Sequence, residues 1–179
     1  MFLIRLFSSF FEFLLAVVMS GVVICVTYRI FIKANPDFDM QAEIKKGNVA
    51  TGLLVGVIII CSSVFVEKGM SSVVSMARLY LALPAHSPIP LWHLALVGLG
   101  HLVVSLLLAV LTISVTLRMF GRFTSEMQDG KELQKGNVAM GILLSSVVIV
   151  ATFYVSGGLS AISRALIPQP SIGRIEIQK

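Results

Sequence analysis

The stretch EIKKGNVATGLL at residues 43–54 returns with few changes as ELQKGNVAMGIL at residues 132–143. In each copy a short charged segment leads directly into a long apolar run. A shift of 89 positions aligns the two copies without a gap. The same shift pairs further residues outside the motif: Arg29 with Arg118, Phe31 with Phe120, Gly69 with Gly158 and Ser71 with Ser160. Because one offset explains all of these matches, the sequence predicts a tandem repeat.

The composition is that of a membrane protein. Hydrophobic residues make up 56% of the 179 and charged residues 13%, with a mean hydropathy of +0.94, whereas soluble domains carry about 25% charged residues. A bilayer-spanning helix needs roughly 20 apolar residues, and the chain offers four such runs. The five excess positive charges lie beside these runs, as membrane insertion favours. We therefore expect the lipid bilayer as the main surrounding, and no nucleic-acid partner.

The predicted fold is an all-α membrane protein with four transmembrane helices, arranged as two parallel two-helix repeats with short interfacial helices. The first repeat with its interfacial helix covers residues 9–83, the second repeat covers 91–167, and 168–179 form a polar C-terminal tail. We expect the spans at about 9–32, 48–66, 91–117 and 137–155. Glu67, Lys68 and Gly69 are expected to end the second span. The apolar segment after them is too short to cross a bilayer, which favours an interfacial helix.

Basic residues predict the orientation of the spans. The two connections that carry the motif hold eight of them: Arg29, Lys33, Lys45, Lys46, Arg118, Arg122, Lys131 and Lys135. The other side holds six: Arg5, Lys68, Arg78, Arg164, Arg174 and Lys179. Positive charge favours the cytoplasmic side, so we expect both connections there and both termini outside. Because each repeat has two spans, the repeats are expected to be related by a pseudo-twofold axis along the membrane normal.

The repeated KGN triplet stands where a polar loop meets an apolar helix. Its members are Lys46, Gly47 and Asn48 in the first copy and Lys135, Gly136 and Asn137 in the second. The asparagine suits an N-cap, since its side chain can accept a hydrogen bond from an amide of the first turn. The glycine permits a sharp backbone bend, and the lysine can reach the phosphate layer. Two interpretations remain open: the triplet only starts a membrane helix, or the two caps pack against one another or bind a headgroup or ion.

Small residues follow each cap. Gly52 and Gly56 form a GxxxG pair, and Gly141 and Ser145 form the matching pair in the second copy. In lipid, such faces let helix backbones approach closely. We interpret the second and fourth spans as the inner packing pair, or as the faces that meet a neighbouring subunit. The alternative is that these are incidental small residues of a membrane helix.

Two ionisable residues lie inside predicted spans at matching positions, Glu12 and His101. A lone intramembrane charge is costly, and a contact between this acid and this base would relieve the cost. One hypothesis is a gate or a proton-sensitive contact. The simpler alternative is an interfacial glutamate and a histidine that never meet.

No catalytic pattern stands out. Serine, histidine and aspartate occur without a nucleophile motif, and no carboxylate cluster suggests a metal. Neither Cys25 nor Cys61 has a cysteine or histidine at metal-ligand spacing, so both are interpreted as small apolar side chains. We expect no catalytic residue, metal or cofactor, and hence no enzyme.

The pattern E-[IL]-x-K-G-N-x-A-x-G, used twice with two spans per copy, resembles the domain of unknown function 350 family, the YjfL-like bacterial inner-membrane proteins. The resemblance runs from about Phe10 to Ile167. It implies a four-span protein of the bacterial inner membrane built from two tandem copies, which puts the termini in the periplasm and both KGN loops in the cytoplasm. The family name assigns no activity.

Two functions remain in competition. The leading one is a non-enzymatic membrane subunit that self-associates or joins a larger complex with other membrane protein chains. The alternative is a small oligomeric ion channel or transporter, with Glu12, His101, Asn48 and Asn137 lining or gating a path. A third class, a lipid-binding accessory, would need a headgroup bound at the two KGN helix starts.

Overall fold

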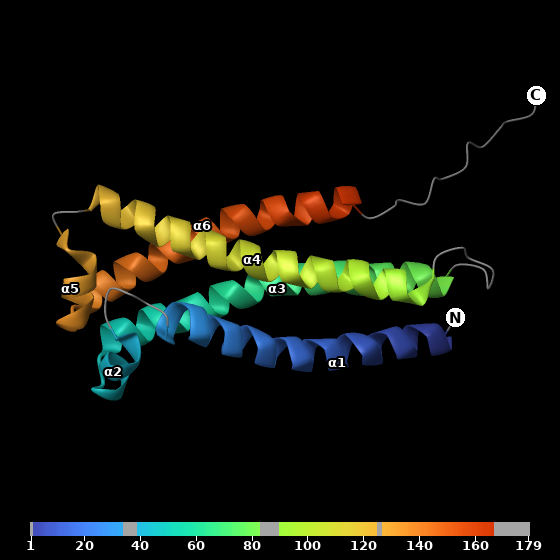
Figure 1. The fold of residues 1–179 in the computed structure, drawn as a ribbon, viewed down its shortest axis with the longest axis horizontal. Helices are drawn as coiled ribbons and strands as arrows, with labels where there is room; N and C mark the ends of the chain where they lie inside the picture. Colours follow the sequence, from blue (N-terminus) through green and yellow to red (C-terminus); the bar gives the residue numbers. More distant parts are fainter. Residues whose placement is uncertain (1, 34–38, 83–89, 125–126, 167–179) are drawn as a thin grey trace, which may run out of the picture.

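All regular structure in the described chain is helical (Figure 1). The computed structural model describes residues 2–33, 39–82, 90–124 and 127–166; the predicted tail at 168–179 lies outside them. The helices are α1 (Phe2–Thr27), the π-helix η1 (Tyr28–Lys33), α2 (Met40–Lys45), α3 (Val49–Ala82), α4 (Leu91–Phe123), α5 (Asp129–Gln134) and α6 (Val138–Leu166). The long helices α1, α3, α4 and α6 form an elongated bundle. The short helices α2 and α5 lie together at one end, and the start of α1 and the end of α6 lie towards the other (Figure 1).

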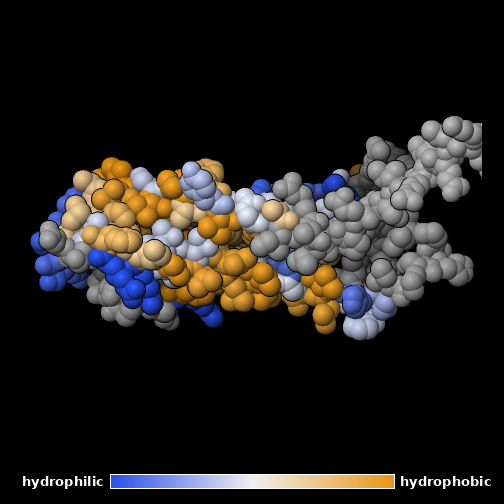
Figure 2. Space-filling model, turned by 90° about the horizontal axis from the view of Figure 1, so that it is seen from above, coloured by the Kyte–Doolittle hydropathy of each residue, from blue (hydrophilic) through white to orange (hydrophobic). Residues whose placement is uncertain are grey.

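Each long helix carries an apolar segment that is long enough to cross a bilayer. These segments are Ser9–Ile32, Val49–Arg78, Ala95–Phe123 and Val138–Ala161. Figure 2 shows apolar residues over the middle of the bundle and hydrophilic residues at the end that carries α2 and α5. The predicted all-α membrane fold with four transmembrane helices is therefore confirmed, and the chain is a multi-pass membrane protein.

Helix α3 lies at the centre of the bundle. Its most extensive contact is with α6, followed by α4 and then α1, and α4 also packs on α6. The main core cluster draws on η1, α3, α4, α5 and α6: Phe31, Ala50, Leu54, Ile58, Cys61, Ile113, Leu133, Met140, Leu144 and Val148. The α3–α6 contact therefore joins the two halves of the sequence, and it lies next to the two caps.

Helix α3 does not end at Gly69 as predicted but continues to Ala82. The expected interfacial helix after Gly69 is thus the last part of a single long helix. A glycine costs a helix only about 1 kcal/mol, which packing readily offsets. Here it allows α4 to come close, because a Cβ on Gly69 would lie 2.8 Å from the Ser105 Cβ and 3.2 Å from the His101 carbonyl oxygen. Helix α6 likewise runs past its predicted end near residue 155, to Leu166.

Candidate functional site

The first KGN triplet forms a tight turn between α2 and α3. Gly47 has φ +82°, a left-handed conformation that glycine adopts without steric cost. The Gly47 amide donates to the Ile44 carbonyl and the Asn48 amide to the Glu43 carbonyl, both at 3.0 Å. These two bonds are the Schellman motif that ends a helix. The Asn48 Oδ1 atom then accepts from the Thr51 amide at 3.1 Å, so one residue completes α2 and caps α3.

The second triplet builds the same turn between α5 and α6. Gly136 has φ +80°. The Gly136 amide donates to the Leu133 carbonyl at 2.9 Å, and the Asn137 amide donates to the Glu132 carbonyl at 3.0 Å. Asn137 Oδ1 accepts from the Met140 amide at 3.3 Å. Identical residues thus produce identical backbone geometry at both places.

A carboxylate and a lysine close each turn. Lys46 Nζ donates to Glu43 Oε1 and Lys135 Nζ donates to Glu132 Oε1, both at 2.7 Å. The capping asparagine of each turn donates to the second carboxylate oxygen. The hydrogen bond from the lysine, followed by that from the asparagine, lowers the pKa of Glu43 and of Glu132 below the ordinary value. Neither glutamate was assigned a role from the sequence, although a lysine three residues after a glutamate on a helix signals such a pair.

Asn48 also links the two caps. Its Nδ2 donates to the Leu133 carbonyl of α5 at 2.8 Å. Within the described residues Asn137 makes no matching bond to α2; its Nδ2 bonds only to Glu132. The Glu43 side chain is 9% exposed and that of Glu132 is 30% exposed. The first cap is therefore enclosed by the second, whereas the second stays open.

The small residues that follow the two caps also differ in how far the chain covers them. A Cβ on Gly141 would lie 2.8 Å from the Ala50 carbonyl oxygen, so this glycine lets α6 touch the backbone of α3. Ser145 is buried, and its hydroxyl has no partner in the described part of the chain. Gly52 and Gly56 have no atom within 4 Å of an added Cβ. The glycine face of α3 is thus not covered by the described chain.

Glu12 and His101 do not meet. Glu12 Oε2 accepts from Arg78 Nη2 at 2.8 Å, and both side chains are about half exposed. His101 Nδ1 lies 3.0 Å from the Val97 carbonyl oxygen. Its buried Nε2 has no partner among the described residues. Because α3 continues past its expected end, it brings Arg78 to the level of Glu12, and the arrangement is that of the simpler alternative, in which Glu12 and His101 do not meet.

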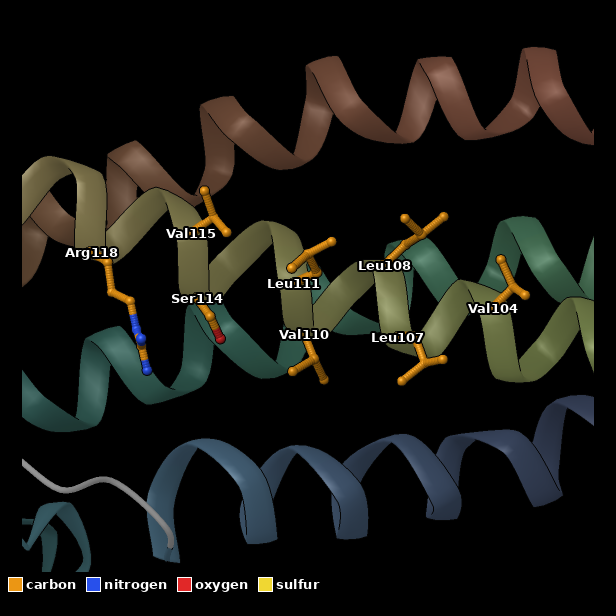
Figure 3. A pocket seen from close by; sticks show the side chains of 8 residues that line it. All are labelled: Val104, Leu107, Leu108, Val110, Leu111, Ser114, Val115 and Arg118. Atoms are coloured by element: carbon orange, nitrogen blue, oxygen red, sulfur yellow. The ribbon is translucent and has the colours of Figure 1, made fainter.

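A shallow pocket of about 580 Å³ lies along α4 (Figure 3). Its lining comes from α4 alone: Val104, Leu107, Leu108, Val110, Leu111, Ser114, Val115 and Arg118. All are apolar except Ser114 and Arg118, which lies at the end towards the caps. Such a surface suits hydrocarbon chains rather than a polar substrate.

A model of the family described as Domain of Unknown Function (DUF350) matches residues 5–159. The match covers most of the chain and includes both caps. No curated protein and no solved structure matches this chain.

Proposed function

The chain belongs to the DUF350 family, and we propose that it is a non-enzymatic membrane subunit that self-associates or joins a larger membrane complex. The observation that carries the proposal is the uncovered glycine face of α3, formed by Gly52 and Gly56. Within the chain, Gly141 holds α6 against the α3 backbone. A second helix would find the same close approach at the open face, and small-residue faces drive helix association in lipid.

The non-enzymatic part of the proposal rests on how the caps use their polar groups. The carboxylate of each cap bonds to the lysine and the asparagine of its own turn. Groups engaged in this way suit a structural role. The arrangement favours rigid ends on α3 and α6, on which a partner helix can dock in a fixed position.

We further propose that the protein resides in the bacterial inner membrane, with both KGN loops in the cytoplasm and both termini in the periplasm. The excess of basic residues in the two connections supports this orientation. The common position of α2 and α5 at one end of the bundle is compatible with it.

Native mass spectrometry of the tagged protein, extracted gently with its lipids, tests the proposal. We expect a homo-oligomer of fixed number, or other chains at fixed stoichiometry. Gly52→Leu should reduce the assembly, whereas the matched change Gly100→Leu on α4, which also has open space around its Cβ, should not. A monomer both in the spectrometer and in single-molecule photobleaching in lipid would refute the proposal.

A small channel or transporter is the second candidate, because several buried polar atoms lack partners. Within the long helices of the described chain these are Thr51 Oγ1, Ser62 Oγ and Ser145 Oγ in α3 and α6, and His101 Nε2 in α4; Asp129 Oδ1 in α5 is a further one. Unpaired polar groups inside a membrane bundle cost free energy unless water or an ion reaches them. Ion flux into proteoliposomes that falls with Ser145→Ala and His101→Ala would support this function. Flux equal to that of empty liposomes would count against it.

A further inference from the structure

We propose that copies of this chain associate head to tail, with the outer face of α6 of one copy against the glycine face of α3 of the next. The inference rests on the proposed self-association and specifies its geometry. The contact between two copies would repeat the contact that already joins the two halves of one chain.

Matching faces of α3 and α6 are covered to different degrees. Four residues of α3 lie in the core and are at most 4% exposed: Ala50, Leu54, Cys61 and Phe65. The residues 89 positions later are exposed: Ala139, Leu143, Val150 and Tyr154. For Leu143, Val150 and Tyr154 the exposed fractions are 38%, 54% and 82%. A surface that is buried in one half of the chain is thus present and open in the other half.

A polar contact between the two caps also has an unused counterpart. The Asn48 side-chain Nδ2 donates to the Leu133 carbonyl, which also accepts from the Gly136 backbone amide of its own turn. The matching carbonyl is that of Ile44 in α2, an exposed residue whose oxygen accepts from Gly47. A carbonyl has two lone pairs, so this oxygen can accept a second bond. The side-chain Nδ2 of Asn137, an exposed residue, is the matching donor, and in a second copy it would find this acceptor.

The close glycine contact between α3 and α6 is made by only one of the two copies of the motif. Gly141 lies against the Ala50 backbone, whereas the matching pair is apart: Gly52 has open space around its Cβ and Ala139 is exposed. The contact between the halves is therefore not reciprocal. Val55, one turn from the glycine, is covered by η1 and α2 of its own chain. The part of this region that stays open to a second copy is the glycine face of α3, formed by Gly52 and Gly56.

A contact between two different surfaces is heterologous. Repeated from copy to copy, it gives a ring if the rotation closes and an open row if it does not. A twofold dimer would instead bring like surfaces together. The two geometries place different residues at the contact, so cross-linking can separate them.

The experiment uses the full chain with Cys25→Ser, which removes the exposed native thiol; the other cysteine, Cys61, is buried. Two copies with different tags are co-expressed, one with Lys45→Cys and one with Val138→Cys, and treated in membranes with a short bismaleimide. Both positions are exposed. The intrachain control is one chain with Val49→Cys and Gln134→Cys, since Asn48 and Gln134 are in contact.

We expect the mixed product to dominate over both like-with-like products. Gly52→Leu should abolish it, and Gly100→Leu should leave it intact. Like-with-like products would overturn the head-to-tail geometry while keeping self-association. Co-purification of other chains without cross-linked copies would also overturn it, leaving the proposed function standing. A bare monomer would refute both.

Discussion

Replacing Asn48 by alanine should cost the folded bundle more than replacing Asn137, although the two residues sit in identical turns. Both side chains cap a long helix. Only Asn48 also donates across to α5, at 2.8 Å from the Leu133 carbonyl oxygen. The comparison therefore isolates the bond that joins the two halves of the chain.

The magnitude follows from two terms. Loss of an N-cap typically costs about 1 kcal/mol. Loss of one further hydrogen bond costs about 1 kcal/mol net. We expect about 2 kcal/mol for Asn48→Ala and about 1 kcal/mol for Asn137→Ala. Asn48→Asp should fall near the smaller value, because aspartate keeps the capping acceptor and loses only the donor of the bond to Leu133.

The assay is reversible unfolding in bicelles, followed by circular dichroism over a denaturant series. All variants are made in the Gly52→Leu background, so that contacts between copies do not add to the cost at Asn137. Equal losses for the two alanine variants would refute the reasoning, since the cap-to-cap bond would then contribute nothing.

Further expectations concern the glycines, the charged pair and the caps. Gly141→Ala should destabilise the bundle by about 1–3 kcal/mol, because its Cβ meets the α3 backbone. Gly52→Ala should leave the unfolding midpoint of the monomer unchanged or raised. Similar losses of stability in both variants would contradict the packing described. A double-mutant cycle on Glu12 and Arg78 should give a coupling free energy below about 1 kcal/mol, because both side chains are half exposed. A clearly larger coupling free energy would show that the pair is shielded from water. The lowered pKa of Glu43 means that its contribution to stability is complete above the ordinary carboxyl pKa and is lost as the pH falls through the lowered pKa. Glu43→Gln should therefore make stability fall less steeply at acid pH. An unchanged acid limb of the stability–pH curve would show that Glu43 is not a source of the pH dependence.

The sequence was sufficient for the local structure of the caps. Glycine before asparagine at the start of an apolar run has few backbone solutions, and the turns at Gly47 and Gly136 follow from residue type alone. The four spans follow from length and hydropathy. Both depend on interactions that are close in sequence, which is why they can be predicted.

The contacts between distant segments were harder to predict. Gly69 was expected to end a helix, yet its role depends on Ser105 of another helix. Arg78 was assigned to an interfacial helix, so its pairing with Glu12 could not be foreseen. The different exposure of matching residues such as Ala50 and Ala139 depends on how the two halves dock, which no local pattern records.

The length of α3 has a consequence for how the protein sits in its membrane. Its 34 residues, at about 1.5 Å each, give a rod of about 50 Å, against a hydrocarbon thickness of about 30 Å. A tilt at the upper end of the observed range, about 40°, still leaves a vertical height near 40 Å. The helix therefore projects beyond the acyl chains on the side away from the caps, where Arg78 lies near its end and pairs with Glu12 of α1. On that side of the membrane, a water-soluble protein can reach the bundle without entering the lipid.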